Sequence, residues 1–232
     1  PYFSQRNYGD FDDRWKSMQH YLDFMVERLK EMHRLLKPTG SIYVHLDWHA
    51  VHYVKVEMDR IFGYRNFKNS LSWCYRSAGF SKDRFSPKHD DILFYSKTDN
   101  HNFNLEAVRE KEIGEETLKR FGKDIEKFGG FYYGRHNGKL YKKNPYSPPR
   151  DWFVINAIPQ ASKERTGYAT QKPDELMERI ILASSNEGDL VADFFCGSGS
   201  FIKKAFELGR RCIGVDVSPK ALALAHCPTP LA

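Results

Sequence analysis

The sequence predicts an α/β fold built on a doubly wound, mostly parallel sheet that carries an insert. Strand and helix patterns alternate near both ends of the 232-residue chain, as they do in the strand–helix–strand units of parallel sheets. The stretch between 100 and 165 lacks this alternation. Near the C-terminus a short apolar strand runs into a glycine-rich turn and a helix, in VADFFCGSGSF at 191–201. The length suits one large domain with an insert.

The first part of the chain predicts a helix, a strand and a second helix in succession. Apolar residues recur at steps of four and three, which places one apolar stripe along a helix that stops at the Lys-Pro-Thr-Gly run 37–40. A strand is expected over 41–46, and a second helix ends at Gly63. β-Branched and aromatic residues then predict strands over 71–75 and 92–95. The stripe consists of Met18, Leu22, Met25, Leu29, Met32 and Leu36.

Residues 100–165 lose this periodicity. Charged residues are dense, with eleven Lys or Arg against seven Asp or Glu between 101 and 150, and Gly, Pro and Tyr recur. This composition predicts an insert rather than a piece of the regular sheet.

The C-terminal part returns to alternating strands and helices. Gly209 is placed to end one of these helices. Ser218 and Pro219 suit the N-cap and the first position of a last helix. The elements expected in order are a helix from about Pro173 to Ser184, a strand over 190–192, a helix over 200–208 and a strand over 212–215.

The composition excludes several classes of protein. Hydrophobic residues at 41% and aromatic residues at 15% argue against a disordered tail, and the net charge of +6 is compatible with an anionic partner. No apolar run is long enough for a transmembrane helix and no signal peptide opens the chain. The cysteines are scattered without a C-x-x-C pair, which favours a reduced, cytoplasmic setting over a disulfide framework or a zinc site. They are Cys74, Cys196, Cys212 and Cys227.

The glycine turn at 197–199 is of a kind that holds nucleotide-like ligands. The G-x-x-x-x-G-K-[ST] loop of triphosphate sites is absent. A dinucleotide loop needs a third glycine where this chain has Ile202, and Asp193 would repel a pyrophosphate. S-adenosylmethionine carries no phosphate and has a cationic sulfonium and an ammonium group, so an acid beside the loop favours it. Asp216 is placed to accept hydrogen bonds from ribose hydroxyls, which both cofactors have.

The segment TQKPDELMERIILASSNEGDLVADFFCGSGSFIKKAFELGRRCIGVDVS at 170–218 resembles the cofactor half of the amino-methylating DNA methyltransferases, the N6-adenine/N4-cytosine family. The similar subgroup is the permuted one, with its target-base half first and its cofactor half last. The family loop usually reads D-P-F-x-G-S-G-T, and here Phe194 and Ser200 replace the Pro and the Thr. The resemblance implies a Rossmann-like sheet of the S-adenosylmethionine-dependent type, and it places Lys172 near the carboxylate of the cofactor. The cofactor-binding residues that it implies are Lys172, Asp193, Phe194, Phe195, Cys196, Gly197, Ser198, Gly199 and Asp216.

The N-terminus is similar to the target-base half of the same family. In the family a tetrapeptide, Asp-, Asn- or Ser-Pro-Pro-Tyr/Phe, ends a strand at the active site, and Pro1-Tyr2 matches its second half. By this match Tyr2 stacks on a base flipped from duplex DNA. The acceptor residue of the tetrapeptide would lie upstream of Pro1, so we expect this chain to bind cofactor and to transfer methyl groups poorly. An exocyclic amine is the implied target, with N6 of adenine favoured over N4 of cytosine.

The resemblance also divides the chain and implies its partners. Residues 1–99 correspond to the target-base half, 100–165 to the variable target-recognition insert and 166–232 to the cofactor half. The expected partner is double-stranded DNA, and a restriction endonuclease and a second copy of the chain are further candidates. Basic residues that alternate with Phe80 and Phe85 are expected to contact phosphates. They are Arg76, Lys82, Arg84 and Lys88.

One cluster and two other functions stay open at this point. His and Asp in HLDWHAVH at 45–52 are metal-ligand types, but the run crosses from a strand to a helix, which scatters the side chains. No metal site is therefore predicted from His45, Asp47, His49 and His52, and the family match places Asp47 near the base pocket. A related RNA amino-methyltransferase and an inactive cofactor- or DNA-binding module are the alternatives to a DNA methyltransferase.

Overall fold

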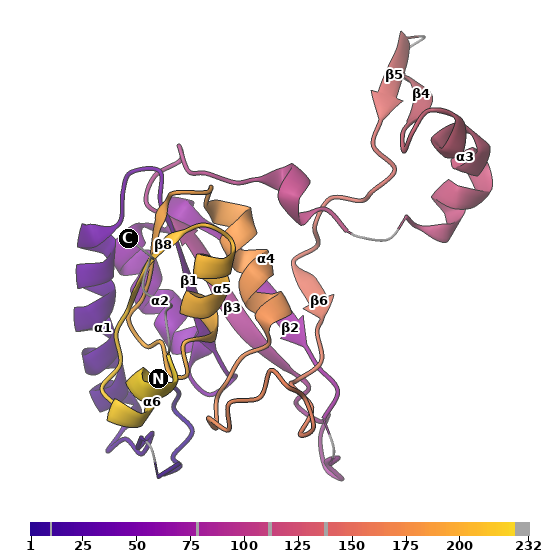
Figure 1. The fold of residues 1–232 in the computed structure, drawn as a ribbon. Helices are drawn as coiled ribbons and strands as arrows, with labels where there is room; N and C mark the ends of the chain where they lie inside the picture. The colour runs from indigo at the N-terminus through magenta and orange to yellow at the C-terminus, as the bar shows by residue number, and fades with distance from the viewer. Residues whose placement is uncertain (10, 78, 111–112, 137–138, 226–232) are drawn as a thin grey trace, which may run out of the picture. The chain divides into compact units, whose positions relative to one another are not determined.

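A computed structural model describes residues 1–9, 11–77, 79–110, 113–136 and 139–225 (Figure 1). Cys227 and the end of the expected cofactor half lie outside the described residues. The chain forms two compact units. The larger unit consists of Pro1–Phe103 and Asp151–Ala232, and the smaller unit of Asn104–Arg150.

The first helix of the larger unit confirms the apolar stripe. Helix α1 (Met18–Leu35) begins where the Ser17 side chain accepts a hydrogen bond from the His20 N–H, and its inner face buries Tyr21, Met25 and Leu29. Strand β1 (Ser41–Leu46) and helix α2 (Val51–Phe62) follow as the pattern predicts. A short 3₁₀ turn (Tyr64–Asn66) leads into the next strand.

A four-stranded sheet forms the centre of this unit, in the order β1-β3-β2-β6. Strand β3 (His89–Ser96) lies antiparallel to both β1 and β2 (Phe67–Cys74), so β1 and β2 run in the same direction. Strand β6 (Trp152–Val154) lies parallel to β2. Strand β2 begins at Phe67, four residues before its expected start, because the polar run Lys68 to Ser70 gives no apolar signal.

The C-terminal part adds a second pair of strands. The elements are α4 (Asp174–Ser184), β7 (Leu190–Asp193), α5 (Ser200–Glu207), β8 (Arg211–Gly214) and α6 (Pro219–Leu224). Strands β7 and β8 are parallel, joined through α5 as a strand–helix–strand unit. The caps expected for the last helix are present, with Ser218 accepting from the Ala221 N–H and Pro219 as the first residue.

Helices cover both faces of the four-stranded sheet (Figure 1). One core packs α1 and α2 against Leu93 and Tyr95 of β3. The other packs α4 and α5 against Ile92 of β3 and Trp73 of β2. Neighbouring residues of β3 thus point into opposite cores, as a strand buried on both faces requires. The α/β fold with helices on both faces of the sheet is therefore confirmed.

The smaller unit contains regular elements where the sequence pattern indicated none. It consists of a 3₁₀ turn (Leu105–Val108), helix α3 (Glu115–Lys127) and an antiparallel hairpin of β4 (Tyr132–His136) and β5 (Lys139–Lys143). Helix and hairpin meet where the Phe121 and Tyr132 rings stack 4.3 Å apart. In neither unit does a described helix have the length and apolar character needed to cross a bilayer.

Candidate active site

The glycine turn lies between the end of β7 and the start of α5. Gly197 and Gly199 both have positive φ, at 50° and 78°, a conformation that favours glycine. A Cβ on Gly199 would lie 2.6 Å from the Ala225 Cβ, and one on Gly197 would lie 3.0 Å from the Tyr168 ring. Both positions therefore need glycine for conformation and for space.

Two carboxylates flank this turn, because the carboxyl ends of the parallel strands β7 and β8 lie at the same edge. Asp193 accepts a hydrogen bond from the Phe195 N–H at 3.0 Å, and burial raises its pKa above the usual value. Asp216 accepts from the Gly197 N–H at 2.8 Å and, through its other oxygen, from the Ser218 N–H at 2.9 Å. Asp216 thus holds the turn and begins α6, and each oxygen keeps a lone pair for a further donor.

The aromatic and sulfur side chains of the turn have different environments. Phe194 is half-buried, while Phe195 is exposed and has its ring 6.3 Å from that of Phe24 on α1. Cys196 is buried, its N–H donates to Val215, and burial raises the pKa of its thiol to about 11. The Cys196 sulfur is therefore a packed thiol rather than a thiolate.

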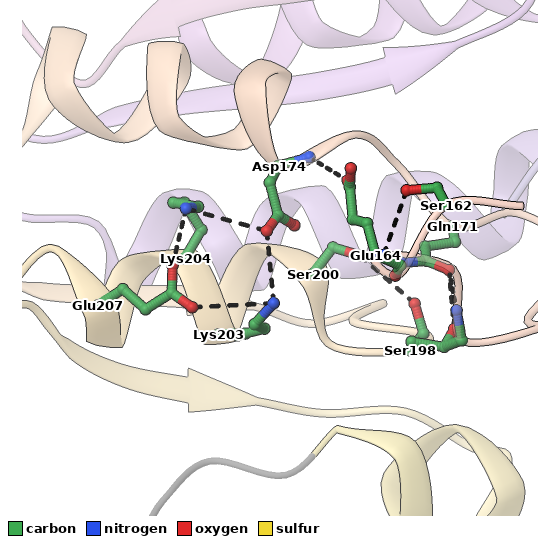
Figure 2. Close-up of polar contacts among 10 residues, drawn as sticks. Ser162, Glu164, Gln171, Asp174, Ser198, Ser200, Lys203, Lys204 and Glu207 are labelled. Carbon is green, nitrogen blue, oxygen red and sulfur yellow. Dashed lines mark hydrogen bonds and ion pairs between the residues drawn. The ribbon is translucent and has the colours of Figure 1, made fainter. Parts of the chain in front are cut away.

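A small polar cavity of about 50 Å³ adjoins the turn, between the start of α5 and the loop before α4. Figure 2 shows Lys203 and Lys204 directed at Asp174, whose N–H donates to the Glu164 carboxylate at 2.7 Å. Acidic groups, a lysine and three hydroxyls thus meet in one place. The cavity is lined by Glu164, Thr166, Gln171, Asp174, Ser198, Gly199, Ser200, Lys203, Leu224 and Ala225.

Tyr2 packs against residues from two distant segments of the chain. Its ring lies nearly perpendicular to the His45 ring with the ring centres 5.8 Å apart, and the Lys172 ammonium lies 5.0 Å from its centre. Burial raises the pKa of Tyr2 well above its usual value, so its hydroxyl stays protonated. An aromatic ring with a fixed orientation therefore occupies the position that the family match assigns to base stacking.

A hydrogen-bonded network beside Tyr2 crosses the sheet. His45 Nε2 lies 3.1 Å from Asp90 Oδ2, and the Tyr75 hydroxyl donates to Asp90 Oδ1 at 3.2 Å. Burial lowers the pKa of His45 to about 4, so the imidazole is neutral at pH 7. Burial would raise the pKa of Asp90, but the hydrogen bond from His45 and nearby charges outweigh it and lower the pKa. Asp90 is thus an anion that accepts from both neighbours.

The histidine-rich run that opens with His45 is divided between different partners. His45 pairs with Asp90, whereas His49 Nδ1 pairs with Asp47 at 2.8 Å, and His52 is exposed on α2. Among the described residues, no three His, Cys, Asp or Glu side chains gather as a metal site would need.

Lys172 lies among side chains from distant parts of the chain. Its ammonium donates to the Thr170 carbonyl at 2.8 Å. Burial lowers its pKa to about 8, while the charges of Asp90 and Asp193 act in the opposite direction. The Tyr2 ring and the carboxylates of Asp90 and Asp193 thus all act on one lysine.

The basic loop between β2 and β3 is organised by one of its own lysines. The Lys88 ammonium donates to the Ser77 carbonyl, the Ser77 hydroxyl and the Gly79 carbonyl at 2.7 to 2.9 Å. All three of its hydrogens are therefore used inside the loop. The other expected DNA-contacting residues, Arg76, Lys82 and Arg84, are exposed, as are the Phe80 and Phe85 rings.

Several site residues could not be identified from the sequence. Asp90, Tyr75, Trp15 and Tyr21 belong to no short motif, and each reaches the site from another part of the chain. The one available signal is the acidic pair Asp90-Asp91 directly before the apolar run 92–95 of β3, where a buried carboxylate needs partners.

Comparison with known proteins gives a consistent family. The sequence model of the family N6_N4_Mtase, described as DNA methylase, matches residues 1–226. The Type II methyltransferase M.HpaI of Haemophilus parainfluenzae is 31% identical over 97% of this chain and 64% of its own length. The DNA adenine methyltransferase YhdJ of Escherichia coli strain K12 is 28% identical over 97% of this chain and 71% of its own length. The chain therefore spans about two thirds of these relatives.

Solved structures share the fold at low identity. The PvuII DNA methyltransferase, described as cytosine-N4-specific, matches with a TM-score of 0.65 at 17% identity, over 98% of this chain and 76% of that one. TTHA0409 of Thermus thermophilus is described as a putative DNA modification methylase complexed with S-adenosyl-L-methionine. It matches with a TM-score of 0.57 at 19% identity, over 91% of this chain and 79% of that one. With the family match over residues 1–226, these findings confirm the resemblance, and the chain belongs to the N6/N4 DNA methylase family.

Proposed function

We propose that this chain carries the catalytic machinery of an S-adenosylmethionine-dependent, site-specific DNA methyltransferase that acts on an exocyclic base amine. The observation that supports this most is the meeting of the two halves at Lys172. The stacking aromatic Tyr2 lies on one side of the lysine, and the acid Asp193 of the glycine turn acts on it from the other. A methyl donor and a base must be brought together in this way for direct transfer.

The charges and shapes at the turn fit S-adenosylmethionine. Asp193 supplies negative charge where a sulfonium or an ammonium would be stabilised. Asp216 can accept ribose hydroxyls at the end of β8, on lone pairs that the two backbone donors leave over. Because both glycines are closely approached by Tyr168 and Ala225, the turn is shaped by its neighbours as well as by its own backbone.

The amino-acid end of the cofactor carries both signs of charge. Lys172, which the family match assigns to the cofactor carboxylate, has a buried ammonium. The cavity beside Ser198 and Ser200 offers hydroxyls, carboxylates and a lysine, so it can satisfy an ammonium and a carboxylate together (Figure 2). When bound, the cofactor supplies the methyl group, and the residues of the chain orient it.

The target half would bind and orient the base. The lone pair of an exocyclic amine is delocalised into its ring, so the amine is a poor nucleophile and must be aligned with the methyl–sulfur bond. Tyr2 stacks on the flipped base, the nearly perpendicular His45 ring packs against Tyr2, and no covalent intermediate with the protein is needed. We propose N6 of adenine as the target in preference to N4 of cytosine. Proteins described with each specificity are among those similar to this chain.

The remaining assignments concern DNA. We propose that residues 100–165, which include the smaller unit, recognise the DNA sequence, with residues 1–99 and 166–232 as the target and cofactor halves. Arg76, Lys82 and Arg84 contact phosphates, while Lys88 fixes the loop that carries them. Double-stranded DNA is the partner, and the similarity to Type II methyltransferases supports a restriction endonuclease of the same specificity beside it. A homodimer is a further proposal.

A calorimetric titration of the purified protein with S-adenosylmethionine tests the cofactor assignment first. Binding of S-adenosylmethionine and not of NAD is expected, and Asp216→Ala should abolish it because the turn loses two hydrogen bonds. Asp189→Asn is the matched control, since Asp189 accepts from the Asn186 N–H at a turn before β7. Binding of NAD alone, or equal affinity in Asp216→Ala, would contradict the proposal.

Methyl transfer tests the substrate. Unmodified plasmid DNA and a structured RNA are incubated with labelled S-adenosylmethionine and a form of the protein that carries the complete tetrapeptide, and the modified base is identified by mass spectrometry. N6-methyladenine in DNA, formed much more slowly but still measurably by Tyr2→Ala, is the expected result. N4-methylcytosine would overturn the adenine assignment, and label in RNA alone would overturn the DNA assignment.

A further inference from the structure

The backbone carbonyls of Pro1 and Tyr2 both accept hydrogen bonds from side chains. The Trp15 indole N–H donates to the Tyr2 carbonyl at 3.0 Å, and the Tyr21 hydroxyl donates to the Pro1 carbonyl at 3.1 Å. Both carbonyls of the dipeptide thus have a side-chain donor from the segment that follows them in the chain.

These two donors are themselves fixed by packing. Tyr21 has no exposed surface and lies on the inner face of α1. The Trp15 ring meets the Tyr21 ring edge-on at 5.1 Å and packs against Phe24 at 4.9 Å. Burial raises the pKa of Tyr21 well above its usual value, so its hydroxyl remains a donor at any pH of interest. Neither donor can turn away without disturbing the core.

The loop between Tyr2 and Trp15 is fixed to Trp15 by Gln5. Gln5 accepts from the Trp15 N–H at 3.1 Å and donates to the Trp15 carbonyl at 3.2 Å, and it adopts a positive φ of 55° to do so. A non-glycine residue rarely adopts such a conformation, so the surrounding contacts must hold it. The Asp13 carboxylate is also buried here, with one oxygen unpaired among the described residues, and burial raises its pKa.

We propose that Trp15 and Tyr21 are positioning residues that fix the ring of Tyr2 for base stacking. This rests on the proposed function, in which Tyr2 is the stacking aromatic. The Tyr2 ring is attached to a backbone whose carbonyls are hydrogen-bonded to Trp15, just before α1, and to Tyr21 on α1. The position of α1 therefore sets the position of the ring. A displacement of about 1 Å at such a group can lower a rate by about a hundredfold.

Two variants remove the hydrogen bonds and keep an aromatic ring at each position. Trp15→Phe deletes the indole N–H, and Tyr21→Phe deletes the hydroxyl. Tyr95→Phe is the matched control, because the buried Tyr95 donates its hydroxyl to Asp59 at 2.7 Å in the same core. All three should lower the melting temperature. Only Trp15→Phe and Tyr21→Phe should lower the rate of methyl transfer to plasmid DNA, by about tenfold, with the affinity for S-adenosylmethionine within about twofold of the parent.

The same variants in a Tyr2→Ala background separate positioning from general damage. If Trp15 and Tyr21 act through Tyr2, their substitutions have no further effect once the ring is gone. Equal losses with and without the Tyr2 ring, or parental rates in both single variants, would overturn the proposal. A crystal structure of Tyr21→Phe gives an outcome independent of cofactor and DNA. The Tyr2 ring should shift relative to Lys172, and an unmoved ring would contradict the proposal even if the protein proved to bind no S-adenosylmethionine.

Discussion

The ammonium of Lys172 lies 5.0 Å from the centre of the Tyr2 ring, so a residue of the expected cofactor half contacts the aromatic of the expected target half. A cation over an aromatic face contributes about 0.5 to 2 kcal/mol, and more as water is removed. The same ammonium is acted on by Asp90 and Asp193, from either half. The charge on Lys172 should therefore affect the binding of S-adenosylmethionine and of the target base.

Cofactor affinity should depend on the protonation of Lys172. Burial lowers the pKa of this lysine to about 8, so the ammonium that would pair with the cofactor carboxylate is lost as pH rises through 8. Titration calorimetry from about pH 7 to about pH 9.5 should show affinity for S-adenosylmethionine falling across this range. Lys172→Gln should bind more weakly at pH 7 and show no such fall. A parallel decline in the variant would assign the pH dependence to another group.

Acid stability should depend on His45. Burial lowers the pKa of His45 to about 4, from an unfolded value of 6.5. Between these values the unfolded chain binds the proton and the folded chain does not, so stability falls as pH falls from 6.5 toward 4. Urea unfolding at pH 7 and pH 5 should show this loss in the parent and a smaller loss in His45→Gln. His52→Gln, on the exposed surface of α2, should behave like the parent.

The glycine at the start of α5 should tolerate no side chain. Gly199→Ala combines a positive φ with a Cβ 2.6 Å from Ala225, and should lower the free energy of unfolding by about 1 to 3 kcal/mol and weaken cofactor binding. Gly167→Ala is the matched control, because Gly167 has a φ of 87° and no atom within 4 Å of the added Cβ. Chemical denaturation should show a smaller loss in the control. Equal losses would mean that backbone conformation alone, and not the contact with Ala225, determines the effect.

The basic loop should divide into phosphate contacts and one structural lysine. Lys82→Gln and Arg84→Gln should each reduce the slope of log affinity against log salt by about 1 for duplex DNA. Lys88→Gln should weaken binding with little change of slope, because its hydrogens are used by Ser77 and Gly79. Fluorescence anisotropy over a range of salt concentrations measures this, with Lys37→Gln as an exposed control. A unit change of slope in Lys88→Gln would show instead that Lys88 contacts a phosphate.

The sequence predicts those helices and strands whose own residues carry a clear apolar pattern. The stripe from Met18 to Leu36 identifies α1, because its period brings those residues onto one face. Helix α3 carries a shorter stripe of Leu118, Phe121 and Ile125, of which Ile125 alone is buried among the described residues, and the hairpin after it is mostly exposed. Strand β6 has three residues and exists through pairing with β2, some eighty positions earlier.

The same division holds within the site. Asp193 and Gly197 could be predicted because they belong to one contiguous turn, and Asp216 because it follows the next strand of the same strand–helix–strand unit. The contact of His45 with Asp90 spans 45 positions, and that of Tyr21 with Pro1 spans 20. No rule of sequence spacing predicts either contact. These contacts form only when the sheet and α1 have packed together, so the structure is needed to identify the residues.

The smaller unit is inserted between two strands of one sheet. Its first residue, Asn104, follows β3 and its last, Arg150, precedes β6, and both strands lie directly beside β2. A segment attached in this way can be exchanged for another without changing the strand order of the sheet or the residues around Tyr2. With this unit in the recognition role proposed above, we expect the DNA sequence preference of such proteins to diverge by exchange of the unit, while the chemistry of the core is inherited unchanged.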